Sequence, residues 1–299
     1  MLDLLGGVGM AEGLLELLSP AVWVSLLQQW PQGEAVAAGM LRSLLIASGE
    51  ELPSGSGFSG YARVHFNDRL GWLAFRQGKL LEAWSEAEGR CVAGLEAYRA
   101  LQEGLERGDP SLYRLTPEVI LPLLALTRGS LRAAGIPAAS VIAGDLFASL
   151  GQEGFGGALI LEDAPGSLEP PLPRLTEGAS GQAWYFIGGQ VLFGAEVPPG
   201  FSRGRLYLVQ MPLKEPPDLR EALAQAEHQG RAKQLEALWG AAGIVLREYM
   251  GRGAASALDR LRRSHPGEDP AALSLALRHW FENSLEPNAA RMFDRLVKG

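Results

Sequence analysis

The chain has 299 residues, about twice the usual length of one domain, so we expect two or three domains. Apolar residues make up 47% of it and charged residues 20%, a globular balance that excludes a disordered or collagen-like chain. The net charge of −7 repels phosphate backbones and disfavours general nucleic-acid binding. Residues 1–218 carry 15 basic and 24 acidic residues, whereas residues 219–299 carry 12 and 10, which predicts different tasks for the two parts.

The first 50 residues have the pattern of helices. Ser19-Pro20 is typical of a helix start, and Trp23, Leu26 and Leu27 then fall on one apolar face. A second helix is predicted over Glu34–Ser48.

The periodicity then changes from helix to strand. Tyr61–Phe66 alternates between apolar and polar residues, and Trp72–Phe75 and Lys79–Trp84 predict two further strands. Gln77-Gly78 lies between these two and predicts a tight hairpin turn. A helical pattern returns over Glu86–Gly104.

The same order recurs later in the chain and indicates an internal repeat. Residues 57–64 align with 154–161, and residues 72–81 align with 183–192, which places Gly78 over Gly189. Both glycines would supply the positive φ that a hairpin turn requires. Chance similarity of two apolar hairpins is the alternative.

The copies are each preceded by a predicted helix, at 41–49 and 141–151, but they differ afterwards. The second copy inserts Asp163–Gly181, which is rich in proline, between its first two strands. It also lacks the helix that follows the first hairpin and continues directly into a strand, Arg205–Val209.

A proline-rich linker, Pro212–Pro217, leads into an entirely helical region. Helices are predicted over Asp218–Trp239, Ala242–Arg263 and Asp269–Lys298, and Pro287 divides the last of these.

The sequence therefore predicts an α+β protein with two related helix-plus-β-hairpin modules and a helical C-terminal module. The expected domains are 1–130, 131–211 and 218–299.

No motif predicts a catalytic residue, a metal site or a cofactor. Gly55–Gly60 matches G-x-G-x-x-G, but a helix precedes it and a strand follows it, the reverse of a dinucleotide site. The single cysteine, Cys91, lies in apolar surroundings and is interpreted as a buried, inert thiol. The chain shows no basic signal-peptide start and no apolar stretch long enough to span a membrane, so we expect a cytoplasmic protein without a membrane span.

Two segments are candidate interaction surfaces. Arg260, Arg262 and Arg263 lie at a predicted helix C-terminus, where they either complement the helix dipole or bind an anionic partner. Pro170, Pro171 and Pro173 form a P-x-x-P spacing, which is either a polyproline II ligand or a plain exposed loop.

The first hairpin ends in Phe75-x-x-Gly78-x-Leu80-Leu81-x-Ala83. This resembles the bacterial PATAN domain family, which has a hairpin ending in Phe-x-x-Gly-x-hydrophobic-hydrophobic-x-Ala, a preceding helix and a following Ala/Leu-rich helix.

The resemblance is carried by residues 57–84, with a degenerate second copy at 154–195 in which Gly194 replaces the motif alanine. It implies protein–protein signalling in bacteria, including control of surface motility and development, in association with receiver domains. It implies no catalytic residues.

The expected function is a non-catalytic interaction or adaptor protein in bacterial signal transduction or in surface-motility or assembly control. A response regulator or a motility or assembly component is the expected partner. One alternative is a hydrolase or transferase whose site is assembled from scattered residues. The other is a nucleic-acid binder that uses the C-terminal helices.

Overall fold

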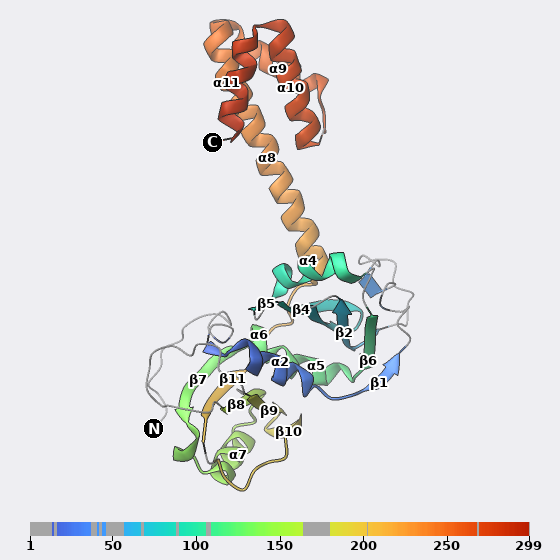
Figure 1. Cartoon of the computed structure of the whole chain (residues 1–299), viewed down its shortest axis with the longest axis vertical. Helices are drawn as coiled ribbons and strands as arrows, with labels where there is room; N and C mark the ends of the chain where they lie inside the picture. Colours follow the sequence, from blue (N-terminus) through green and yellow to red (C-terminus); the bar gives the residue numbers. More distant parts are fainter. Residues whose placement is uncertain are drawn as a thin grey trace. The chain divides into compact units, whose positions relative to one another are not determined.

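The chain divides into two compact units, residues 1–222 and residues 223–299, each described by itself (Figure 1). The structure is a computed structural model. It describes residues 14, 17–36, 41, 44–45, 57–66, 69–87, 90–105, 109–163, 180–201, 203–267 and 269–298.

The first unit contains strands and helices, as the predicted α+β class requires. The strands are β1 (Glu34–Val36), β2 (Gly60–Phe66), β3 (Arg69–Arg76), β4 (Lys79–Ala87), β5 (Arg90–Ala93), β6 (Asp109–Arg114), β7 (Ser130–Pro137), β8 (Gly157–Asp163), β9 (Ser180–Ile187), β10 (Gln190–Gly194) and β11 (Arg205–Gln210). The helices of this unit are α2 (Pro20–Gln28), α4 (Gly94–Leu105), α5 (Pro117–Leu123), α6 (Ala125–Arg128), the 3₁₀ helix η1 (Ala138–Ser140) and α7 (Ala143–Gln152).

The strands form two antiparallel sheets with the same topology. Sheet A has the order β1-β6-β2-β3-β4-β5, and sheet B has the order β7-β11-β8-β9-β10. Each strand of sheet B thus has a counterpart in sheet A, and β5 alone has none. The predicted duplication is confirmed, and we call residues 34–114 module one and residues 130–210 module two.

The two hairpin turns agree in backbone conformation. Gln77 and Gly78 have φ of 51° and 81°, and Gly188 and Gly189 have φ of 55° and 80°. Two consecutive residues of positive φ are typical of the type I′ turn that joins twisted antiparallel strands. Gly78 and Gly189 therefore occupy equivalent turns, as the repeat predicts.

The turns are also held by equivalent hydrogen bonds. The Gly78 amide donates to the Phe58 carbonyl at 2.8 Å, and the Gly189 amide donates to the Phe155 carbonyl at the same distance. Both phenylalanines pack edge-on against the aromatic residue three positions before the turn glycine, with ring centroids 5.9 and 5.6 Å apart.

One hydrophobic core lies between the sheets, with α2, α5 and α6 inside it (Figure 1). Helix α2 begins as predicted, because the Ser19 side chain accepts a hydrogen bond from the Val22 amide. Trp30 contacts Tyr61 and Trp84 edge-on at centroid distances of 5.2 and 4.9 Å. Because this core includes residues of both modules, the predicted bounds at 130 and 131 separate two halves of one compact unit.

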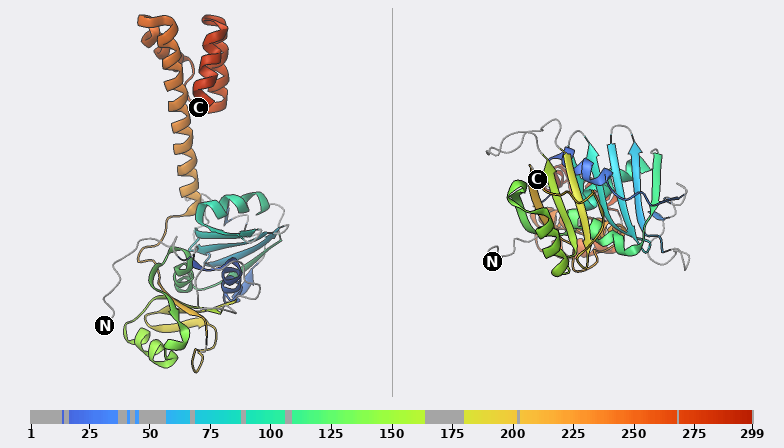
Figure 2. Two further views of the ribbon diagram at one scale, coloured as in Figure 1. Left: turned by 60° about the vertical axis from the view of Figure 1, so that its left-hand side comes forward. Right: turned by 90° about the horizontal axis from the view of Figure 1, so that it is seen from below.

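Each sheet is also covered on its outer face. Figures 1 and 2 show α4 against sheet A and α7 against sheet B. In module two, Leu159, Trp184 and Phe186 pack with α7, whereas their strand neighbours Ala158 and Tyr185 face the central core. This alternation is what a strand buried on both faces requires. Between β10 and β11 the described residues contain no helix, so module two lacks a counterpart of α4, as predicted.

The helical region consists of α8 (Leu219–Met250), η2 (Gly251–Gly253), α9 (Ala254–Ser264), α10 (Pro270–Ser284) and α11 (Pro287–Lys298). The second unit has its own core, which includes Leu246, Leu277, Phe281 and Phe293. Asp269 caps α10 by accepting a hydrogen bond from the Ala271 amide at 3.1 Å, as the Asp-Pro pair predicts.

Three element predictions are wrong. Glu34–Val36, expected in a helix, is the edge strand β1, because these residues pair with Arg114 to Leu112 of β6. Residues 86 and 87 end β4, and Cys91 and Val92 belong to β5 rather than to the helix, which begins only at Gly94. In both cases strand pairing overrides the local helical pattern: β1 pairs with the distant strand β6, and β5 pairs with the neighbouring strand β4.

The third correction concerns the helical region. Helix α8 continues through the predicted break at residues 240–241 to Met250, and the break lies instead at Gly251–Gly253. Gly251 has φ of 54°, a conformation that ends a helix and that glycine adopts without strain.

We predict that Gly157→Ala destabilises the protein by more than about 1 kcal/mol. Gly157 opens β8 with φ of 153°, and an added Cβ would overlap the Val209 carbonyl oxygen of the paired strand. Gly200→Ala is the control, because no atom lies within 4 Å of its added Cβ. Urea denaturation gives the unfolding midpoint of each variant. Equal midpoints for the two variants would contradict the close approach of β8 and β11.

Candidate functional site

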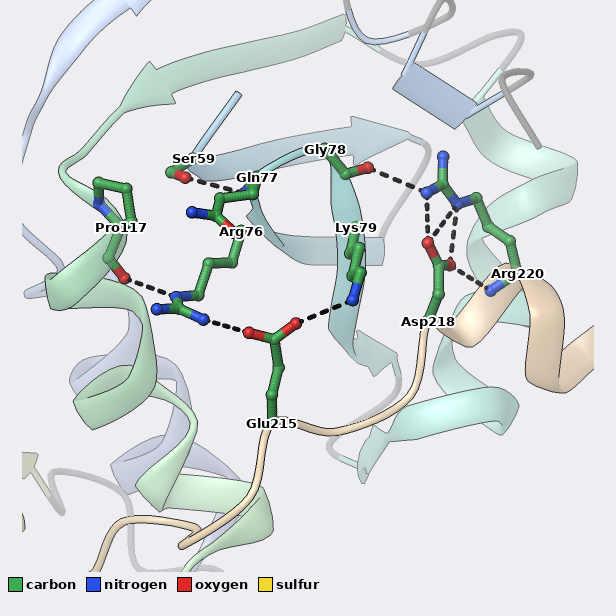
Figure 3. A network of polar contacts seen from close by, with 9 residues as sticks. All are labelled: Ser59, Arg76, Gln77, Gly78, Lys79, Pro117, Glu215, Asp218 and Arg220. Atoms are coloured by element: carbon green, nitrogen blue, oxygen red, sulfur yellow. Dashed lines mark hydrogen bonds and ion pairs between the residues drawn. The ribbon is translucent and has the colours of Figure 1, made fainter. Parts of the chain in front are cut away.

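The linker before α8 is bound to the hairpin turn of module one by ion pairs (Figure 3). The Glu215 carboxylate contacts the Arg76 guanidinium and lies 3.3 Å from the Lys79 ammonium. Arg76 Nε also donates to the Pro117 carbonyl at 3.1 Å. Because Arg76 and Lys79 flank the turn, Glu215 joins both strands of the hairpin to the linker.

A second ion pair fixes the first turn of α8. Asp218 and Arg220 are both nearly buried, with side chains 5% and 10% exposed. The Asp218 carboxylate accepts from the Arg220 amide at 2.9 Å, so it caps the helix as well as pairing with the guanidinium. Arg220 in turn donates to the Gly78 carbonyl at 2.9 Å and to the Leu44 carbonyl. The start of α8 is therefore tied to the hairpin turn itself.

The turn that receives these contacts is braced from its other side. The backbone amide of Gln77 donates to the Ser59 hydroxyl at 2.9 Å. This hydrogen bond supports the positive φ of Gln77, a conformation that residues other than glycine rarely adopt. The charged groups at this junction are paired with each other, so the arrangement holds the linker and the first residues of α8 to the hairpin turn.

A buried carboxylate holds sheet A to the central helices. Glu82 is fully buried and pairs with Arg128, while the Thr127 hydroxyl donates to it at 3.0 Å. Its other oxygen accepts from the Ala83 amide at 3.0 Å. Burial of this charge is compensated by three donors, as a buried carboxylate requires. Glu82 therefore joins β4 to α6.

The thiol of Cys91 is partly buried on β5. Burial, together with the nearby Glu86 carboxylate, raises its pKa to about 12. The thiolate is the reactive form of cysteine, so very little of it exists near neutral pH.

The predicted basic residues lie on the solvent side of α9. Arg260, Arg262 and Arg263 are exposed, while Ala257 and Leu261 of the same helix face the core. Arg262 lies over the Trp239 ring at 5.7 Å. We call these three arginines the basic cluster.

The other predicted surface, Pro170, Pro171 and Pro173, lies outside the described residues, and the structure does not test it. Three residues predicted in the insertion belong to strands instead: Asp163 ends β8, and Ser180 and Gly181 begin β9.

The described part of the chain contains neither a metal-binding cluster nor a membrane-spanning helix. No group of three or more His, Cys, Asp or Glu among its residues could hold a metal ion. None of its helices is long and apolar enough to cross a membrane.

Comparison with known proteins gives no relative. No protein-family model, no curated protein and no solved structure matches the chain.

The junction between the linker and the turn is not predicted from the sequence, which gives Glu215 only as part of a linker and Asp218 only as the start of a helix. Glu215 pairs with Arg76, 139 positions away, and Arg220, the neighbour that pairs with Asp218, reaches Gly78, 142 positions away. One local feature could have indicated Asp218, since an aspartate directly before a helical pattern is typical of an N-cap.

We predict that Arg220→Ala costs about 3–5 kcal/mol of stability, because it leaves the Asp218 carboxylate buried without its cation. Arg203→Ala is the matched control: Arg203 also pairs with an aspartate, Asp163, but its side chain is 69% exposed. Its loss should cost less than about 1 kcal/mol. Urea denaturation compares the two, and equal losses would show that the junction contributes no more than a surface pair.

We predict that maleimide labels Cys91 in the folded chain at pH 8 at least about 100-fold more slowly than in urea. A pKa of about 12 keeps the native thiol protonated, whereas the unfolded thiol titrates near its usual 9. Since the chain has one cysteine, the label reports on this site alone. The raised pKa of the Cys91 thiol favours the folded state fully below about pH 9. This contribution to stability is lost as the pH rises from 9 towards 12. Equal labelling rates in both states would contradict the burial.

Proposed function

We propose that the chain is a non-catalytic adaptor in bacterial signal transduction or in surface-motility or assembly control, and that it acts in the cytoplasm. In this proposal the basic cluster of α9 binds an acidic surface of a protein partner. A response regulator or a motility or assembly component is the partner class that the PATAN resemblance implies.

The proposal is supported by the contacts that the three guanidinium groups of the basic cluster make. None of the ion pairs among the described residues involves Arg260, Arg262 or Arg263. Within the described ranges, the side chains of Arg260 and Arg263 donate to carbonyls of their own helix, those of Ser256 and Asp259. Like charges one helical turn apart repel each other by a few tenths of a kcal/mol, and an acidic partner would offset that cost.

Charge supports a protein partner over nucleic acid. Residues 219–299 carry only two more basic than acidic residues, and the whole chain has a charge of −7. A nucleic-acid surface usually requires a stripe of cations that neutralises several phosphates. A compact cluster of three, one of them stacked on Trp239, is suited to a carboxylate patch.

We predict that Arg260→Glu with Arg263→Glu abolishes partner binding while the fold is kept. Arg262 is left in place because its guanidinium packs on Trp239. The tagged full-length chain is used to capture proteins from nuclease-treated lysate of the source bacterium, and quantitative mass spectrometry compares the variants. The acidic partner should fall at least about tenfold, as expected when charges that meet a partner are reversed.

The control reverses the same number of charges elsewhere in the same unit. Arg231→Glu with Lys233→Glu changes two exposed residues of α8 and should leave capture unchanged. Equal capture by the Arg260/Arg263 variant would overturn the proposal. If proteins are captured only from lysate that has not been treated with nuclease, the result would favour the nucleic-acid alternative instead.

A further inference from the structure

Helix α8 is anchored separately near its two ends. At its start Leu219 is buried, and Arg220 donates to the Gly78 carbonyl of the hairpin turn (Figure 3). Further along, Leu238 and the residues that follow it belong to the core of the second unit. The division between the two compact units falls inside this helix, after Ala222. The two anchors of α8 therefore belong to different units.

The eleven residues between these anchors, 224–234, contribute no side chain to either core. Ten of them are exposed, and Ala226 is partly exposed. Within the part of the chain that the structure describes, no side chain of 224–234 takes part in a hydrogen bond or an ion pair. Most helices of folded proteins are stabilised by packing of an apolar face, and these three turns have no such packing.

Gly230 lies in the middle of this segment and weakens it further. Its φ is not positive, and no atom lies within 4 Å of an added Cβ, so neither the backbone nor the available space requires a glycine here. Glycine inside a helix lowers the helical population about fivefold relative to alanine. An isolated helix of fewer than about 12 residues is already marginal in water.

We propose that residues 224–234 are a hinge, at which α8 opens by local unfolding while both of its anchors stay folded. Segments with solvent-exposed backbone hydrogen bonds and few buried apolar contacts are those that open at the lowest free energy. The packed turns after Leu238 have the opposite character, because every opening there exposes core side chains. This inference does not rest on the proposed adaptor function.

Two arginines of α8 provide a matched pair of protease sites for the test. Arg231 lies in the hinge and Arg247 lies in the packed part of the helix, and both are exposed. Because a protease cleaves chain that has opened, trypsin should cut the native full-length protein after Arg231 at least about tenfold faster than after Arg247. Lys233 is a second site within the hinge. Mass spectrometry of the first fragments gives the initial rate at each site.

A substitution in the hinge should close it. Gly230→Ala should slow cleavage after Arg231 about fivefold, because the open population falls by the difference in helix propensity. Gly240→Ala is the matched control: Gly240 is exposed on the same helix, and no atom lies within 4 Å of its added Cβ, but it lies in the packed part. The control should be cut after Arg231 at the wild-type rate.

Hydrogen exchange of the wild type tests the hinge without a protease. Amides of residues 228–234 should exchange at least about 100-fold faster than those of Val245 and Leu246, which lie in the second-unit core. Equal protection of the two groups, or equal cleavage after Arg231 and Arg247, would overturn the proposal. So would a Gly230→Ala variant that is cut as fast as the wild type, or a Gly240→Ala variant that slows cleavage after Arg231 to the same extent.

Discussion

The register of both sheets depends on two hairpin turns with left-handed backbone. A shift of one residue would move every side chain of a strand to the opposite face, and here both faces are buried. The type I′ turns at Gly78 and Gly189 prevent that shift, and each is fixed by a hydrogen bond to a phenylalanine carbonyl from outside the hairpin. Trp72 and Trp184 consequently face cores and not solvent.

The first of these turns has acquired a second task. Its Gly78 carbonyl accepts the hydrogen bond from Arg220, so the same turn that sets the register of sheet A also holds the start of α8. At the second turn, α7 approaches so closely that a Cβ on Gly189 would overlap the Gly151 carbonyl. The two equivalent turns therefore contact different elements. The turn at Gly78 contacts the start of α8, and the turn at Gly189 contacts α7.

Local chemistry made the repeat predictable from sequence. Each hairpin requires a glycine of positive φ at its turn and an aromatic residue three positions before it. Both features recur at Gly78 and Gly189. The strand at Glu34–Val36 could not be predicted in this way, because it exists only through pairing with β6, almost eighty residues later. The pair of Asp218 and Arg220 is similar: its bond to Gly78 spans 142 positions. The basic cluster was predicted from sequence because three arginines stand close together near the end of one predicted helix, a purely local pattern.

The shared core limits where this protein can meet others. Both inner sheet faces are buried against α2, α5 and α6, and α4 and α7 lie against the outer faces, where Val191 and Leu192 of β10 stay partly exposed. Binding through the covered part of a sheet face would require a helix to leave, at the cost of exposing its apolar contacts. Edges and separate helices carry no such cost. The exposed arginines of α9 could meet an anionic partner without opening a core, and such binding would weaken as the salt concentration rises.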